Sequence, residues 1–252
     1  KGRAIQNLIN IEQDDRIKAF ICTQDLKDEE YVNSNYVIMA TKMGQVKKTS
    51  LEQYSRPRSN GINAITIKEG DELLAAKLTN GNSQIMLAVQ SGKAIRFEES
   101  KTRPMGRNAS GVRGIRLKDS KDVVVGMISV NDMDANILVV SENGYGKRSS
   151  LEDYRLTNRG GKGVKTISIT EKTGKLVTLK SVSDNDDLMI INKSGIAIRM
   201  QVEDLRVMGR ATQGVKVISI KDGDSIAAVA KVMKDDDDLE DINEIEFTGD
   251  SV

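Results

Sequence analysis

The sequence predicts an all-β protein, a propeller-like array of repeated four-stranded blades. Two sets of glycines recur along the chain with spacings of 48 to 52 residues, which is the length of one propeller blade. Between these glycines lie alternating, β-branched segments of the kind that form strands. No segment shows a helical pattern longer than one or two turns, so the pattern excludes a predominantly helical fold.

The first half of each repeat predicts a β-hairpin. An apolar segment leads into a turn glycine, and a short strand bearing Lys or Arg follows. Glycine suits this turn because it adopts positive φ without strain. A single helical turn is expected after two of the short strands, at 50–54 and 150–154. The four segments are 36–54, 84–101, 136–154 and 187–205, with turn glycines Gly44, Gly92, Gly144 and Gly195.

The second half of each repeat begins at another glycine and contains two further strands. An alternating strand comes first, then a polar turn and a closing apolar strand. Residues 4–22 match only this closing half, so we expect the opening half of a first blade to precede Lys1. The second glycines are Gly61, Gly111, Gly163 and Gly214. The predicted blade units lie near 1–35, 36–83, 84–135, 136–186 and 187–233, and an acidic tail covers 234–252.

The composition excludes several classes of chemistry. The chain has no His, so it lacks a His general base, a His-dependent nucleophile and a His metal ligand. Its single Cys22 can form neither an internal disulfide nor a zinc thiolate cluster. Cys22 follows an apolar run, which predicts a buried, inert thiol. No segment approaches the ~20 apolar residues that span a bilayer, and no signal peptide opens the chain. We therefore expect a cytoplasmic protein without catalytic or metal sites.

The formal net charge of +1 conceals two oppositely charged parts. Residues 235–252 contain nine acidic and no basic residues, which leaves 38 basic against 28 acidic residues before them. A basic body indicates a polyanionic partner, and an acidic tail indicates a segment that competes with that partner. A solvated surface with a solubility tail explains the same charges, and charge alone leaves both interpretations open.

Basic residues recur at equivalent positions of the repeat. A small-molecule site would break the repeat at one place, whereas a repeated cation suits a repeating polyanion such as duplex DNA. Acidic residues recur too, at Glu52, Glu152 and Glu203, which argues against an enzymatic carboxylate pair because such a pair is unique. The repeated cations are Lys48, Arg96, Arg148 and Arg199, joined by Lys47 and Lys147, and then Arg107, Arg159 and Arg210, with Arg56 and Arg58 in the first unit.

One loop carries a more specific signal. Its residues Arg159-Gly160-Gly161-Lys162-Gly163 resemble the last five residues of the Gln-Arg-Arg-Gly-Gly-Lys-Gly box of the DNA gyrase A C-terminal domain, which belongs to the type IIA topoisomerases. The segments 2–8, 111–117, 143–148 and 209–215 resemble blade signatures of that family, and the resemblance covers about residues 1–233. Thr157-Asn158 replace the first two residues of the box, so we interpret 159–163 as a secondary box; the principal one would precede Lys1.

The resemblance implies a β-pinwheel, a disc of about six blades that exchange strands. It implies sequence-independent binding and wrapping of duplex DNA at Arg159, Gly160, Gly161, Lys162, Gly163 and the repeated cations. In the family, wrapping gives the strand-passage core a chiral DNA crossing, so that gyrase introduces negative supercoils with ATP.

The same resemblance implies what lies outside this chain. The catalytic residues and the ATP and Mg sites would lie elsewhere in an A2B2 complex with the rest of gyrase A and with gyrase B. The fragment itself is expected to be monomeric, cofactor-free, cytoplasmic and nucleoid-associated, without a membrane partner. Two alternatives stay open: the equivalent C-terminal domain of topoisomerase IV, and a protein-binding propeller.

Overall fold

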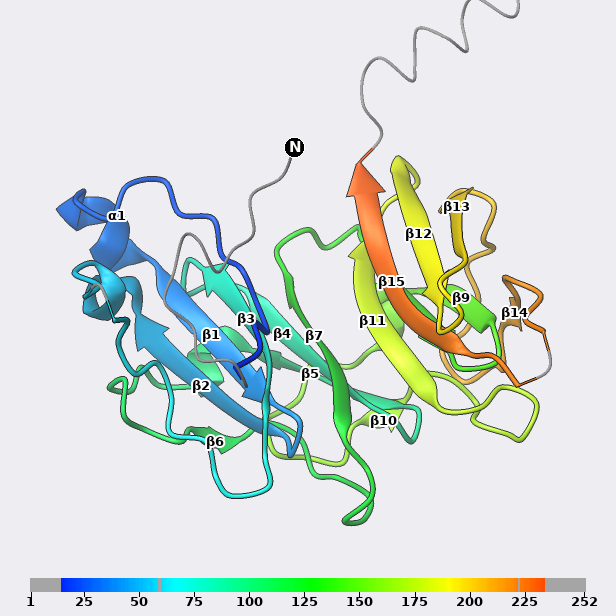
Figure 1. Cartoon of the computed structure of the whole chain (residues 1–252), viewed down its shortest axis with the longest axis horizontal. Coiled ribbons are helices and arrows are strands. Elements are labelled where there is room, and N and C mark those ends of the chain that lie inside the picture. The colour runs from blue at the N-terminus through cyan, green and yellow to red at the C-terminus, as the bar shows by residue number, and fades with distance from the viewer. Residues whose placement is uncertain (1–14, 59, 222, 234–252) are drawn as a thin grey trace, which may run out of the picture.

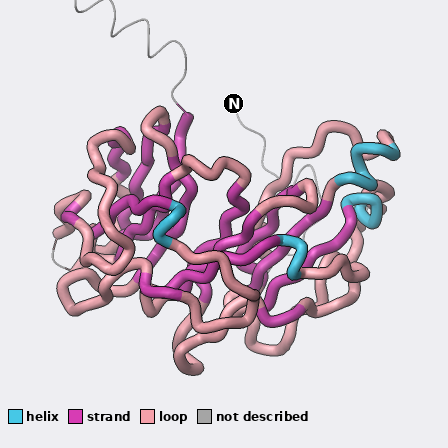
Figure 2. The backbone as a smooth tube through the Cα atoms, turned by 180° about the vertical axis from the view of Figure 1, so that it is seen from behind, coloured by secondary structure: helices cyan, strands magenta, loops and turns pink. Residues whose placement is uncertain are grey.

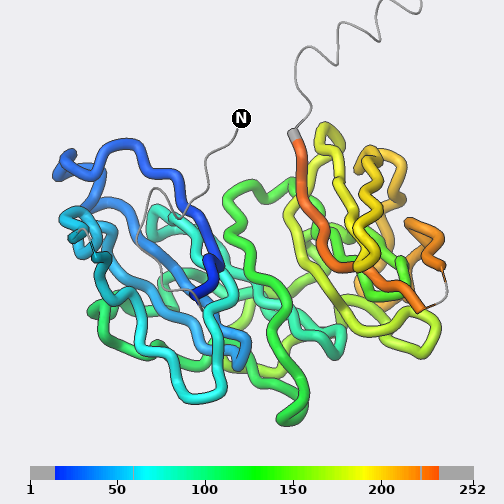
Figure 3. The backbone as a smooth tube through the Cα atoms, viewed as in Figure 1, coloured from blue at the N-terminus to red at the C-terminus, as the bar shows by residue number. Residues whose placement is uncertain are grey.

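The structure of the chain, a computed structural model, describes residues 15–58, 60–221 and 223–233. Its strands form four antiparallel sheets that follow one another across the molecule (Figure 1). The chain passes through these sheets in sequence order, from the blue first sheet to the yellow and orange last one (Figure 3). The predicted all-β array of blades is confirmed. The acidic tail, the signature at 2–8 and most of the closing half at 4–22 lie outside the described residues.

Each blade takes three strands from its own repeat, a hairpin and a closing strand that flanks it. The turn glycines of the hairpins have φ between 78° and 88°, as the glycine spacing predicted. The hairpins are β1 (Tyr36–Thr41) with β2 (Gln45–Ser50), β4 (Gln84–Val89) with β5 (Lys93–Glu98), β8 (Asn136–Ser141) with β9 (Tyr145–Ser150), and β12 (Asp186–Asn192) with β13 (Ala197–Gln201). The closing strands are β3 (Leu73–Thr79), β7 (Val124–Val130), β11 (Leu176–Val182) and β15 (Ile226–Met233).

The fourth strand of a blade is donated by the repeat that follows it. β6 (Val112–Arg113) pairs with β2, β10 (Val164–Lys165) with β5, and β14 (Val215–Lys216) with β9. The resulting sheet orders are β3-β1-β2-β6, β10-β5-β4-β7 and β11-β8-β9-β14. Successive blades are therefore joined by backbone hydrogen bonds as well as by side-chain packing.

The donated strands are shorter than the alternating pattern predicts. Only the first two residues after each glycine join the neighbouring sheet. The isoleucine two residues later then enters the core, where Ile115 and Ile167 are each 1% exposed. Burying such a side chain stabilises the folded state by about 1.5–3 kcal/mol. The apolar residues of the alternating pattern therefore anchor the donated strand.

The array is open at both ends within the described part of the chain. The last sheet has the order β13-β12-β15, and no fourth strand among the described residues pairs with β13. Ile196, just before β13, and Ile198 within it are accordingly 48% and 39% exposed. Residues 61–67 carry the donor pattern Gly-Ile-Asn-Ala-Ile but pair with no described strand. One acceptor edge and one donor segment are left over at opposite ends.

Apolar side chains fill the spaces between successive blades. Ile38 of the first blade and Leu87 of the second share one cluster, and Leu138 and Ile190 join the third blade to the fourth. The closing strands lie on the inner side of the array, where those of successive blades meet: β7 contacts β3 and β11, and β11 contacts β15. The donated strands consequently lie at the outer edge, together with the loops that precede them.

The helices are short and lie at the ends of strands (Figure 2). Asp28 accepts hydrogen bonds from two backbone N–H groups of α1 (Glu29–Ser34), a favourable N-cap. The expected helical turns after the short strands are confirmed as the 3₁₀ turns η2 (Leu51–Tyr54) and η4 (Leu151–Asp153), with a third at η3 (Glu99–Lys101). Within the described ranges, no helix combines the length and apolar character that crossing a membrane requires.

The prediction that Cys22 is buried is wrong, because its thiol is exposed. Burial alternates between half-buried and exposed along residues 19–22, as it does where successive side chains point in opposite directions. Ala19 and Ile21 pack against the first blade, whereas Phe20 is 74% exposed on the other side. The apolar run is therefore covered on one face only, and Cys22 lies on the uncovered face.

The strand exchange predicts that a methyl group at Gly163 destabilises the protein. Gly163 has φ +69°, and a Cβ there would lie 2.5 Å from the Ala94 carbonyl oxygen of the preceding blade. We expect Gly163→Ala to lower the free energy of unfolding by about 1–2 kcal/mol through left-handed strain. A further ~1–3 kcal/mol should follow from overpacking. Urea denaturation measures the loss.

Gly61→Ala is the matched control. Gly61 occupies the same place in the first repeat with φ +75°, but no atom of the described residues lies within 4 Å of a Cβ built there. This variant should show the strain penalty alone. Equal losses for the two variants would contradict the claim that Gly163 is required by the close approach of two blades.

Candidate nucleic-acid interface

The box-like loop 159–163 precedes the donated strand β10 and is held against the preceding repeat by four hydrogen bonds, three of which involve Arg159 and Gly160. The Arg159 guanidinium donates from Nε to the Lys101 carbonyl oxygen at 2.9 Å and from an Nη to that of Arg113 at 3.1 Å. The Gly160 N–H donates to the Gly114 carbonyl at 2.6 Å. These bonds fix the loop backbone. Arg159 serves partly as a clasp, that is, a side chain that hydrogen-bonds one repeat to its neighbour.

Lys162 is the side chain that this loop presents to the surface. The Arg116 N–H donates to the Gly161 carbonyl at 2.8 Å, which fixes the backbone next to Lys162. Its side chain is exposed and borders two hollows, one shared with Arg155 and one shared with Arg116. Three cations from different segments thus meet around one fixed loop.

The repeated Arg before the second glycine has a repeated structural role. Arg210 donates to the Lys165 carbonyl oxygen at 2.9 Å, which matches the bond from Arg159 to Arg113 one blade earlier. Arg107 is half-buried, and its carbonyl oxygen accepts a bond from Lys47 Nζ. In the first unit, by contrast, Arg56 and Arg58 are exposed. The equivalent arginines therefore divide between clasps and surface charges.

Lys47 and Lys147 lie inside the protein, each 0% exposed. The Lys47 ammonium donates to the Ala64 and Arg107 carbonyl oxygens, and that of Lys147 donates to the Gly209 carbonyl at 2.6 Å. Burial, aided by the charge of Arg107, lowers the pKa of Lys47 to about 8. Burial lowers the pKa of Lys147 to about 8 as well. Both ammonium groups crosslink loops of the fold.

The cations four residues after the turn glycines also turn toward the next blade. Arg96 donates to the carbonyl oxygens of Leu151 and Tyr154 in the following 3₁₀ turn. Lys48 pairs with the fully buried Glu99 at 2.9 Å. Arg148 donates to the Leu205 carbonyl oxygen and pairs with Asp184. These side chains fasten each hairpin to loops of the blade that follows.

The expectation that these residues supply surface charge is therefore wrong for four of them. Lys47 and Lys147 are fully buried, and Lys48 and Arg148 are 4% and 6% exposed. A cation at a fixed place in every repeat can equally hold one repeat against the next, and here it does. Arg199 differs: 44% of its side chain is exposed while it pairs with Asp187 at 2.6 Å, because the described chain contains no following blade.

The surface cations that repetition failed to find lie at the junction of the second and third blades. Most of them stand at positions where the other repeats have no cation, although Lys118 has counterparts in Lys68 and Lys221. What these cations share in the sequence is that each lies close to a hairpin turn or to the polar turn after a donated strand. They are Lys93, Arg116, Lys118, Lys121 and Lys175.

The four sheets and their exchanged strands correspond to a known family. The family model described as DNA gyrase C-terminal domain, beta-propeller, matches residues 35–80, 84–131, 135–183 and 186–233. The chain belongs to this family. Each matched segment contains the hairpin and closing strand of one blade, so the gyrase C-terminal-domain model and the blades agree along most of the described chain.

Individual relatives agree with this assignment. The DNA gyrase A protein of Staphylococcus epidermidis is 45% identical over 238 residues, which are 94% of this chain and 26% of that protein. The DNA gyrase A protein of Staphylococcus aureus strain MRSA252 is 44% identical over 239 residues, with the same coverage. The chain thus spans about a quarter of the length of the curated gyrase relatives that it matches.

Two solved structures share the fold. A crystal structure of the C-terminal domain of DNA topoisomerase IV matches with a TM-score of 0.85 at 25% identity, covering 98% of this chain and 76% of that one. A structure of a DNA gyrase A C-terminal domain matches with a TM-score of 0.80 at 25% identity, covering 92% and 76%. The predicted resemblance and the β-pinwheel are confirmed, and the higher sequence identity of the curated relatives favours gyrase over topoisomerase IV.

The buried lysines of this gyrase-family domain predict a stability that rises with alkaline pH. In the unfolded chain a lysine has a pKa of about 10.4, whereas Lys47 and Lys147 have values of about 8 when folded. Between these values the unfolded state binds more protons, so the free energy of unfolding increases with pH. Burial raises the pKa of Tyr54 and Tyr154, which opposes the trend above about pH 10. Urea titrations between about pH 8 and 9.5 measure the slope.

Lys47→Met should reduce that slope, and Lys147→Met should do so independently. Lys27→Met is the control, because Lys27 is exposed. A slope that survives both single substitutions unchanged would contradict the assignment of the lysines as its source.

Proposed function

We propose that the chain binds duplex DNA along the outer edge of the β-pinwheel, where the box-like loop presents Lys162. The observation that carries this proposal is the loop itself. Arg159 and Gly160 are hydrogen-bonded to the preceding blade, so Lys162 is held outward with Arg116 and Arg155 beside it. A cation on a pre-fixed loop loses less conformational freedom when it binds a phosphate.

The contacts address phosphates rather than bases. Lys and Arg side chains on an outer edge neutralise backbone charge, which fixes register but reads no sequence. Binding is therefore sequence-independent, and its affinity falls steeply with salt as counterions are released. The topoisomerase relatives support DNA as the polyanion, since they are named DNA gyrase and DNA topoisomerase IV.

Within a whole gyrase the same contacts would wrap the duplex. Bending a site of 20–30 base pairs by 40–90° costs on the order of 1–6 kcal/mol, so contacts from several blades must act together. The wrapped duplex would give the strand-passage core a crossing of one handedness, from which ATP-driven supercoiling follows. The rest of gyrase A and gyrase B in an A2B2 complex would supply the bond chemistry, ATP and Mg, in the bacterial cytoplasm at the nucleoid.

Lys162→Gln tests the interface directly. We expect fluorescence anisotropy with a labelled duplex to show weaker binding and a salt slope lower by about 1, because one phosphate contact is lost. Lys27→Gln, at an exposed lysine far along the chain from the loop, should leave both values unchanged. Wild-type affinity that does not vary with salt would overturn the proposal as a whole.

Deleting residues 235–252 tests the role of the acidic tail. This segment carries nine acidic residues and no basic ones, so it competes with DNA for the basic surface. We expect the truncated chain to bind duplex DNA more tightly, with the largest gain at low salt where screening is weakest. Unchanged affinity at every salt concentration would show that the tail does not compete.

A further inference from the structure

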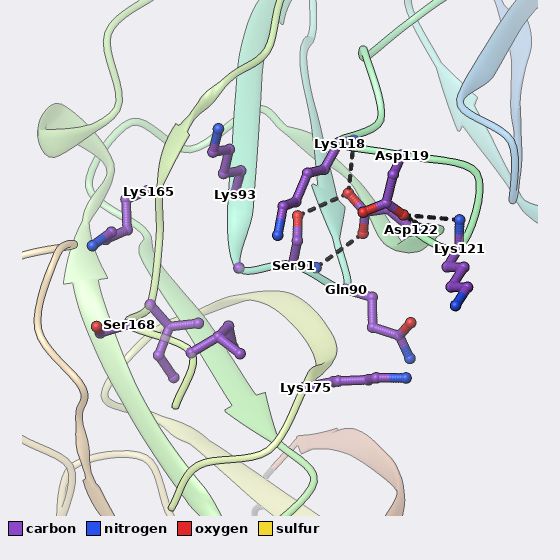
Figure 4. Close-up of a pocket in the computed structure, with 13 residues that line it drawn as sticks. Gln90, Ser91, Lys93, Lys118, Asp119, Lys121, Asp122, Lys165, Ser168 and Lys175 are labelled. Carbon is purple, nitrogen blue, oxygen red and sulfur yellow. Dashed lines mark hydrogen bonds between the residues drawn. The ribbon is translucent and has the colours of Figure 1, made fainter. Parts of the chain in front are cut away.

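Five lysines line one hollow at the junction of the second and third blades, and their side chains extend from its rim in different directions (Figure 4). The hollow has a volume of about 420 Å³. Its walls are the turn between β4 and β5, the polar turn before β7, and the segments that follow β10 and precede β11. In the described part of the chain, none of the five ammonium groups has a hydrogen-bond or ion-pair partner. These residues are Lys93, Lys118, Lys121, Lys165 and Lys175.

The two carboxylates of the hollow are occupied by other donors. Asp122 accepts hydrogen bonds from the Ser91 N–H at 3.0 Å, the Ser91 hydroxyl at 2.8 Å and the Lys118 N–H at 3.1 Å. Asp119 accepts from the backbone N–H of Lys121 at 2.9 Å. Both acids shape the walls through backbone and hydroxyl donors, and they leave the lysine ammonium groups uncompensated by ion pairs.

The preceding junction differs in having an acid that pairs with its lysines. In the corresponding turn of the first blade, Lys42 pairs with Glu72 at 3.0 Å, and Lys18 reaches the same carboxylate at 2.8 Å. The pKa of Glu72 is lowered to about 2 by hydrogen bonds from Lys18 and Lys42. One blade later the lysines have no such acid. Asp119 and Asp122 offset two of the five positive charges, and the net positive charge that remains around the hollow attracts an anion.

The hollow is continuous with the surface around Lys162. A second hollow, of about 180 Å³, is lined by Lys162 and Arg116 and shares Lys93 and Lys118 with the first. Cations therefore extend without a break from the box-like loop, across the outer edge, and into the junction between the blades. A chain of phosphates, rather than one isolated anion, matches this extended arrangement.

We propose that this hollow binds phosphate groups of the duplex DNA backbone, as a second contact beside Lys162. The inference rests on the proposed function and assigns to it a site at the junction of the second and third blades. Phosphodiester oxygens of the duplex replace the missing acids as partners of the ammonium groups. The same chemistry is available from free inorganic phosphate or pyrophosphate, and the experiments distinguish these sources.

Lysine acetylation followed by mass spectrometry tests the site without depending on affinity. The full chain is treated with an acetylating reagent alone, with duplex DNA, or with pyrophosphate. We expect DNA to slow modification of Lys118, Lys121 and Lys175 several-fold and to leave Lys27 and Lys77 unchanged. Protection by pyrophosphate but not by DNA would overturn the proposal in favour of a small-anion site.

A paired substitution supplies the second test. Lys118→Gln with Lys165→Gln removes two charges of the hollow, and Lys27→Gln with Lys77→Gln removes two exposed charges elsewhere. We expect the first pair to lower the salt slope of DNA binding by about 2 and the control pair to leave it unchanged. Matching melting temperatures confirm that both variants fold.

The outcomes separate this proposal from the function on which it rests. If Lys162→Gln weakens binding but the paired hollow variant behaves like its control, DNA bypasses the hollow and only this inference fails. If the wild-type chain shows no salt-dependent DNA binding, the proposed function fails with it.

Discussion

Each blade of the domain is completed by a strand from the repeat that follows it, and most other features depend on this exchange. β6, β10 and β14 each contribute only two residues to the neighbouring sheet. Those residues nevertheless place a glycine against the backbone of the preceding blade and an isoleucine in its core. The exchange puts the donated strands at the outer edge, and the loops that precede them become the outer surface on which Lys162 is displayed.

Basic residues serve two purposes in this arrangement. One group, including Lys47, Lys147 and Arg148, lies at the contacts between repeats and donates to carbonyl oxygens that no strand pairing satisfies. Buried polar groups must be paired, and a long side chain with several donors can reach across two loops. The other group stays at the surface, around the box-like loop and the hollow beside it. Only this second group can meet a polyanion without unfolding part of the domain.

Much of the fold could be predicted from the sequence because the repeat is visible in it. The glycines at 44, 92, 144 and 195 marked the turns, and those at 111, 163 and 214 marked the starts of the donated strands. The candidate site was predicted less well. Arg159 and Lys162 have the same charge and lie three residues apart, yet one is a clasp and the other is exposed. Residue type and spacing do not distinguish these roles.

The sequence by itself determined the all-β repeat, the blade length, the absence of histidine chemistry and the family resemblance, because each depends on local pattern or composition. The tertiary structure decided which cations face solvent, since that depends on how one repeat packs against the next. It also decided that Cys22 is exposed, and that Lys93, Lys118, Lys121, Lys165 and Lys175 line a single hollow. Residues from four separate segments meet there, and only the exchange of strands between blades brings those segments together.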